Sequence, residues 1–158
     1  MTHLGLVIAI VAAATAVAAE TMYPVPNGAL EVGHVALQPG VYEEDHFFVT
    51  EQYPGTSALK HYASIFSHWR ACHGAGDEWQ SFADASGSEP HFIHQLIRHW
   101  VSPHNDVAVT LVLQYVSPGL AVREVPSSER QFVAVARLQH SDAEKDLVEL
   151  GVNCAKGT

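Results

Sequence analysis

The amino-acid sequence predicts an α+β domain: an antiparallel sheet of about four to five strands with one main helix packed on one face and a short C-terminal helix. Three observations support this class. One segment has helical apolar spacing, several β-rich segments are separated by short turns, and a helix-capping pattern lies near the C-terminus. Consecutive strands joined by short turns pair antiparallel, and an amphipathic helix buries its apolar side against another element.

The N-terminal part begins with residues 22–29, which are rich in Pro and Gly and predict an extended lead-in. Residues 29–37 alternate in character and end at a turn over 38–40. The acidic residues 43–45 are expected in a solvated loop. Residues 46–52 are aromatic and β-branched, which predicts a strand.

The main helix is predicted from Thr56 or Ser57, which would cap it, to about Cys72. Its apolar residues recur with the spacing of one helical face, namely Leu59, Tyr62, Ala63, Phe66 and Trp69. Gly74 would end it. The aromatic stripe is interpreted as core.

Residues 78–86 predict the next strand, and residues 91–101 and 106–116 predict a β-hairpin around a four-residue loop. A long polar connection follows over 117–130, and residues 131–138 predict another strand. On this last strand the small and apolar side chains share one side, namely Phe132, Ala134, Ala136 and Leu138.

A short C-terminal helix is predicted after Ser141, which forms a capping box with Glu144. The helix should continue to Leu150, and Gly151 lies just beyond its expected end.

Residues 4–19 form an uncharged run of apolar residues that ends in small side chains. The run is short for a bilayer-spanning helix, which needs roughly 20 residues, and fits a secretory signal better. We therefore expect residues 1–19 to be a signal peptide and residues 20–158 to form a single globular domain. This domain should be extracytoplasmic, either periplasmic or secreted, with no membrane insertion after signal cleavage.

The formal net charge is −9, from 8 basic and 17 acidic residues, and the basic residues are scattered. Nucleic-acid binding is therefore not expected. The chain has no G-x-S-x-G, H-E-x-x-H, phosphate-binding or dinucleotide-binding motif. No catalytic residue, metal ligand or cofactor is assigned on this basis.

The two cysteines, Cys72 and Cys154, are expected to form one disulfide in an oxidising compartment. An alternative uses Cys72 as a zinc ligand together with His68, because residues four apart share one face of a helix. In that case His73 and Cys154 would complete the tetrahedron.

The histidine-rich strand 91–101 is the best candidate site in the sequence. Neither of its faces is wholly apolar, and a helix can cover only one of them. The hypothesis is that four polar side chains form a binding patch on the exposed face, namely His94 and Arg98 with Thr110 and Gln114 of the neighbouring strand. An exposed surface of this kind suits a protein partner or a small-molecule ligand.

The leading interpretation is a small exported binding domain without catalytic activity, such as an inhibitor or neutraliser of another exported protein, that uses an exposed sheet face. One alternative is a small extracytoplasmic hydrolase, with His94 or His99 as base and Asp84 or Asp106 as the orienting carboxylate. A second alternative is a periplasmic or secreted metal-binding protein. The sequence leaves the oligomeric state open.

Overall fold

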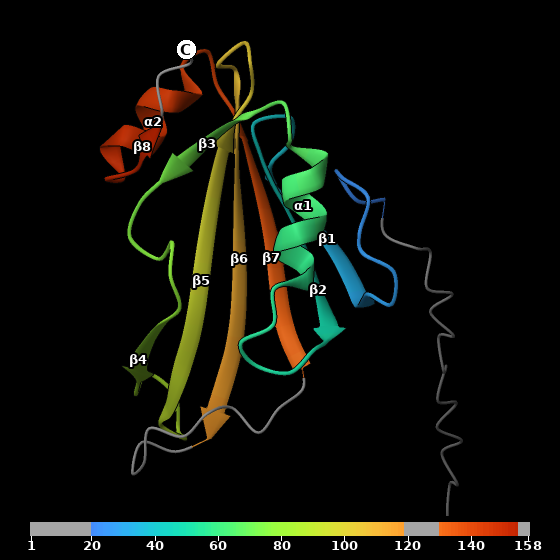
Figure 1. The fold of residues 1–158 in the computed structure, drawn as a ribbon, viewed down its shortest axis with the longest axis vertical. Helices are drawn as coiled ribbons and strands as arrows, with labels where there is room; N and C mark the ends of the chain where they lie inside the picture. The colour runs from blue at the N-terminus through green and yellow to red at the C-terminus, as the bar shows by residue number, and fades with distance from the viewer. Residues whose placement is uncertain (1–19, 119–129, 155–158) are drawn as a thin grey trace, which may run out of the picture.

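The chain forms one antiparallel sheet with two short helices in the computed structural model, which describes residues 20–118 and 130–154 (Figure 1). The strand order is β1-β2-β7-β6-β5-β3-β8, and β4 pairs with the N-terminal part of β5. The strands are β1 (Leu30–Gln38), β2 (Tyr42–Thr50), β3 (Arg70–His73), β4 (Gln80–Asp84), β5 (His91–Val101), β6 (Val107–Pro118), β7 (Arg130–Gln139) and β8 (Asn153–Cys154). The helices are α1 (Ser57–Ile65) and α2 (Ala143–Glu149).

The predicted fold class is wrong in its proportions. The described chain has eight strands in one sheet instead of about four to five, and only 13% of it is helical. Helix α1 ends at Ile65, where the Phe66 amide donates to the carbonyl oxygen of Tyr62. The aromatic rhythm continues to Trp69, which is why the sequence suggests a longer helix. Residues 70–73 instead form β3 and pair with the end of β5.

The central hairpin is confirmed. Strand β5 spans the predicted residues 91–101, and β6 begins at Val107. The loop closes through hydrogen bonds from the Ser102 amide to the Val107 carbonyl and from the Asn105 amide to the Ser102 carbonyl. Eleven cross-strand pairs, from Val101–Ala108 to His91–Pro118, join β5 and β6 along their lengths.

Helix α1 covers one face of the sheet (Figure 1). Its buried residues Ala58 and Tyr62 pack against inward-facing side chains of β2, β5, β6 and β7. The odd-numbered residues of β6 lie on this face, as the alternation of the strand requires, and Val109, Leu111 and Leu113 are fully buried. This face contains the larger hydrophobic core.

Helix α2 packs on the opposite face, at one end of the sheet, where Ala143 and Leu147 join a second core cluster with Val101, Ala108 and Cys72. The predicted C-terminal helix is thus present. Asp142, one residue after the expected cap, accepts a hydrogen bond from the Lys145 amide. Gly151 follows the helix with a positive φ of 82°, which glycine adopts without steric cost.

The predicted signal peptide, residues 1–19, lies outside the described residues, as does most of the predicted connection over 117–130. Neither α1 nor α2 has the length and apolar character that a membrane-crossing helix requires.

Candidate binding groove on the open sheet face

A groove of about 440 Å³ lies on the face of the sheet opposite α1 and beside α2. Its lining comes from β2, β5, β6, β7 and α2. The even-numbered residues of β6 contribute Ala108, Thr110, Val112 and Gln114, which alternate with the residues buried against α1. The groove is therefore a property of the second, incompletely covered face.

Small side chains create the hollow. Ala134 and Ala136 of β7 lie in the middle of the lining, while Phe132 and Leu138 stand before and after them on the same strand. Leu147 and Leu150 of the α2 region close one side. Large residues around two alanines leave space that no other described residue fills.

Three polar side chains of the groove, those of Glu44, Thr110 and His99, follow one cross-strand row. Glu44 of β2 is opposite Ala136 of β7, Ala136 is opposite Thr110 of β6, and Thr110 is opposite His99 of β5. The row continues from His99 to Cys72 of β3. Directly opposed residues of antiparallel strands point to the same face, so Glu44, Thr110 and His99 all belong to the groove.

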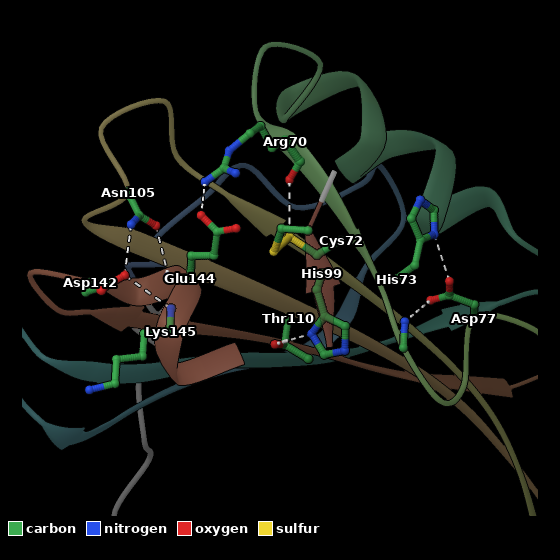
Figure 2. Close-up of a disulfide and its surroundings, with 12 residues drawn as sticks. Arg70, Cys72, His73, Asp77, His99, Asn105, Thr110, Asp142, Glu144 and Lys145 are labelled. Carbon is green, nitrogen blue, oxygen red and sulfur yellow. Dashed lines mark hydrogen bonds and ion pairs between the residues drawn. A yellow bond between two sulfur atoms is a disulfide. The ribbon is translucent and has the colours of Figure 1, made fainter. Parts of the chain in front are cut away.

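His99 is 8% exposed, and its Nδ1 shares a hydrogen bond of 2.9 Å with Thr110 Oγ1 (Figure 2). Burial is the main reason that the pKa of His99 is lowered, with Asp77 opposing the shift and Arg98 adding to it. The imidazole is therefore neutral at pH 7. Its second ring nitrogen makes no hydrogen bond within residues 20–118 and 130–154.

Glu44 supplies a negative charge at the opposite end of the row. Burial and the Glu44 carboxylate together raise the pKa of the neighbouring Tyr42, which also lines the groove. In the part of the chain that the structure describes, the Glu44 side chain has no ion-pair or hydrogen-bond partner. An acceptor is thus available to a ligand.

The structure divides the predicted binding patch between the two faces. Every even-numbered residue of β5 is opposite an odd-numbered residue of β6, so His94 faces Tyr115 and Arg98 faces Leu111. Thr110 and Gln114 lie on the other face and line the groove. The four side chains therefore do not form one surface.

His94 and Arg98 have local structural partners instead. His94 is buried, with Nδ1 2.7 Å from Ser81 Oγ and Nε2 2.9 Å from Ser117 Oγ. Arg98 donates to the carbonyl oxygens of Asp77 and Ile97. These contacts connect β5 to the strands and loops around it.

The constellation considered for a hydrolase is not assembled. Asp84 lies 3.4 Å from His91 instead of beside His94 or His99. Asp106 accepts a hydrogen bond of 2.7 Å from Ser102 Oγ in the hairpin loop.

The predicted disulfide is confirmed, and Cys72 and Cys154 are directly opposed on β3 and β8 (Figure 2). Both sulfurs of the alternative zinc site are thereby used. Within residues 20–118 and 130–154, no group of three His, Cys, Asp or Glu side chains is arranged to hold a metal ion.

The sequence interpretation missed Glu44, Tyr42 and the leucines of the α2 region as groove residues. One signal was present, because Ala134 and Ala136 were expected on one side of their strand. The parity of the hairpin was a second signal, because a loop of four residues places even-numbered residues opposite odd-numbered ones. It would have separated His94 from Thr110.

Comparisons with models of protein families, with curated proteins and with solved structures give no match to this chain.

Proposed function

We propose that this protein is an exported, non-catalytic binding domain that holds a small, mainly apolar ligand in the groove on the open sheet face. The observation that carries the proposal is the groove itself. Its volume of about 440 Å³ falls in the range of roughly 300–1,000 Å³ that small-molecule sites occupy. Such sites combine a mainly apolar lining with a few polar groups, as this groove does.

The arrangement of polar groups favours binding over catalysis. A general base needs an orienting partner within hydrogen-bond reach. His99 contacts Thr110, and Glu44 lies three strands away, or about 14 Å at the usual spacing of roughly 4.8 Å between strands. The two groups can contact different parts of one ligand, but they do not form a catalytic pair.

The hollow shape favours a small ligand over the protein partner considered from the sequence. The space between α2 and the sheet accepts an aliphatic chain or one ring system, with Ala136 as its floor. Burial of apolar ligand surface would supply the main driving force, at about 25 cal/mol per Å² removed from water.

Two observations support export. The uncharged run 4–19 has the length and composition of a signal sequence. The Cys72–Cys154 disulfide fits an oxidising compartment such as the periplasm or the extracellular space.

The proposal is tested with a neutral apolar dye, Nile red, whose fluorescence rises in an apolar site. The wild-type protein should bind the dye saturably. Ala136→Phe fills the floor of the groove and should weaken binding at least about tenfold, which corresponds to about 1.4 kcal/mol. Ala83→Phe is the matched control, because Ala83 is exposed on β4 outside the groove. Equal weakening by both substitutions, or by neither, would exclude the groove as the site.

A further inference from the structure

We propose that the groove selects its ligand by charge: the occupant is an apolar compound that carries an ammonium group, and anionic amphiphiles are rejected. This inference rests on the proposed function and names the ligand class of the same groove. The geometry that supports it is a single carboxylate, Glu44, at the end of an otherwise uncharged lining.

The charges of the lining are one-sided. Among the described residues that form the groove, Glu44 is the one carboxylate, and none is Lys or Arg. His99 is buried and neutral at pH 7, so it adds no positive charge. A carboxylate or phosphate ligand would lose its hydration without gaining a cation, which is unfavourable. An ammonium would gain an ion pair with Glu44.

The surroundings keep Glu44 available. On its own strand the groups on the same side are Tyr42 and His46, while Ala136 of β7 and Val35 of β1 are directly opposite. The nearest arginine on β7, Arg137, pairs with Glu43, whose side chain points to the other face. Arg137 therefore does not neutralise Glu44.

Elsewhere the groove offers uncharged hydrogen-bonding groups. Thr110 and His99 are bonded to each other, and Gln114 donates a hydrogen bond of 2.9 Å to Gln95 Oε1. The free ring nitrogen of His99 is therefore a second polar contact, separated from Glu44 by Ala136 and Thr110 along the row. A ligand with its cation at Glu44 and its apolar body over Ala136 satisfies both the charge and the shape.

The expected discrimination is moderate because Glu44 is only half-buried. Partly exposed ion pairs stabilise by up to about 1 kcal/mol, which is roughly fivefold in affinity. An anion suffers repulsion where the cation gains attraction, so the ammonium and carboxylate forms of one compound should differ by about tenfold or more.

The test measures displacement of Nile red by three eight-carbon compounds at pH 7.5 and low ionic strength, with the full-length mature protein. Octylamine should bind about fivefold more tightly than 1-octanol, and octanoate should bind most weakly. Glu44→Gln should weaken octylamine binding by about fivefold and so abolish the difference between amine and alcohol. Glu78→Gln changes the net charge equally at an exposed position outside the groove and should preserve the order.

The outcomes separate the two proposals. Equal affinity for the three compounds, or preference for octanoate, overturns the charge selection while the groove keeps its binding role. A preference for octylamine that persists in Glu44→Gln and falls in Glu78→Gln also overturns it. Failure of all three compounds and of the dye to bind the folded protein overturns both proposals.

Discussion

Three consecutive acidic residues have three different environments. Glu43 forms an ion pair with Arg137 on the α1 side of the sheet, and Glu44 lines the groove on the other side. Asp45 is fully buried and accepts hydrogen bonds from the Met22 amide and from His34 Nδ1. The sequence interpretation placed all three in a solvated loop, because acidic runs are usually exposed. The environment of each side chain depends on the alternation of β2 and on the strands that pair with it. The acidic run by itself does not indicate either of these.

Asp45 should be a major source of stability. We predict that Asp45→Ala lowers the free energy of unfolding by about 3 kcal/mol, because it removes a buried acceptor and leaves the Met22 amide without one. Asp45→Asn keeps an acceptor oxygen and should cost less, about 1 kcal/mol. Urea unfolding followed by tryptophan fluorescence measures both. A change below about 0.5 kcal/mol in Asp45→Ala would show that the hydrogen bond between the Met22 amide and Asp45 contributes little to stability.

His99 should make stability depend on pH below neutrality. Burial lowers the pKa of His99 in the folded protein, whereas in the unfolded chain the pKa of this histidine is about 6.5. The unfolded state therefore binds the proton more readily, and stability decreases as the pH falls below about 6.5. We predict that His99→Gln is less sensitive than the wild type to a change from pH 7.5 to pH 5.

Two-dimensional NMR provides the independent measurement for His99. Its ring signals should titrate at a lower pH than those of a model histidine peptide. A titration midpoint at or above the peptide value would contradict the assignment of a neutral, buried imidazole.

Two leucines in the α2 region allow the binding of a ligand in the groove to be tested separately from the stability of the fold. Leu147 is 3% exposed and belongs to the second core cluster, whereas Leu150 at the C-terminal cap is 77% exposed, yet both line the groove. Substitution of each leucine by alanine changes the same side of the groove, but only Leu147 is part of the core.

We predict that Leu147→Ala destabilises the fold by about 2–3 kcal/mol, because it opens a cavity in the core. Leu150→Ala should change stability by less than about 0.5 kcal/mol but weaken Nile red binding, because it removes apolar surface from the groove wall. Thermal unfolding and dye titration are measured on the same samples. Unchanged dye affinity in Leu150→Ala would remove α2 from the site.

The disulfide joins two short strands at the edge of the sheet, and its cysteines are separated by 82 positions. The loop-entropy model gives a closure of this length about 4.5 kcal/mol, and measured values are usually lower. We predict that the Cys72→Ala/Cys154→Ala variant loses about 2–4 kcal/mol of stability. Hydrogen exchange should rise in β3 and β8 and stay unchanged in β4, which pairs with the other end of β5. Equal exchange in all three strands would contradict this local effect.

Elements with short-range signals could be predicted from the sequence. The β5–β6 hairpin has a loop of five residues, 102–106, between two β-rich segments, and α2 has a capping residue and a terminal glycine. The sequence predicts a longer helix than α1, because the spacing of Phe66 and Trp69 suits a helix. In the structure, pairing with β5 places residues 70–73 in the sheet instead. Local patterns do not reveal such competition from a distant strand.

At the scale of the whole molecule, the pairing of β2 with β7 decides where the candidate site lies. It places Glu44 opposite Ala136, although the two are far apart in the sequence. No periodicity within either strand indicates that they are neighbours, so the groove could not be assembled from the sequence. The alternation of side chains along each predicted strand could be read from the sequence, but the order of the strands could not.

The sheet also explains why one face remains available for binding. Helix α1 and the lead-in segment cover the first face, where Tyr23 packs edge-on against Phe66. Among residues 20–118 and 130–154, the second face is covered at one end by the short helix α2. The described residues leave part of this face uncovered, and the alanines of β7 make that part hollow.

The most direct test of the central claim is to map ligand contacts by ¹H–¹⁵N NMR during titration with octylamine. The proposal predicts saturable shifts at Glu44, Thr110, Ala136 and Leu150 and little change in α1. Shifts confined to α1 and the lead-in segment, or shifts spread over the whole surface without saturation, would contradict a binding site in the groove.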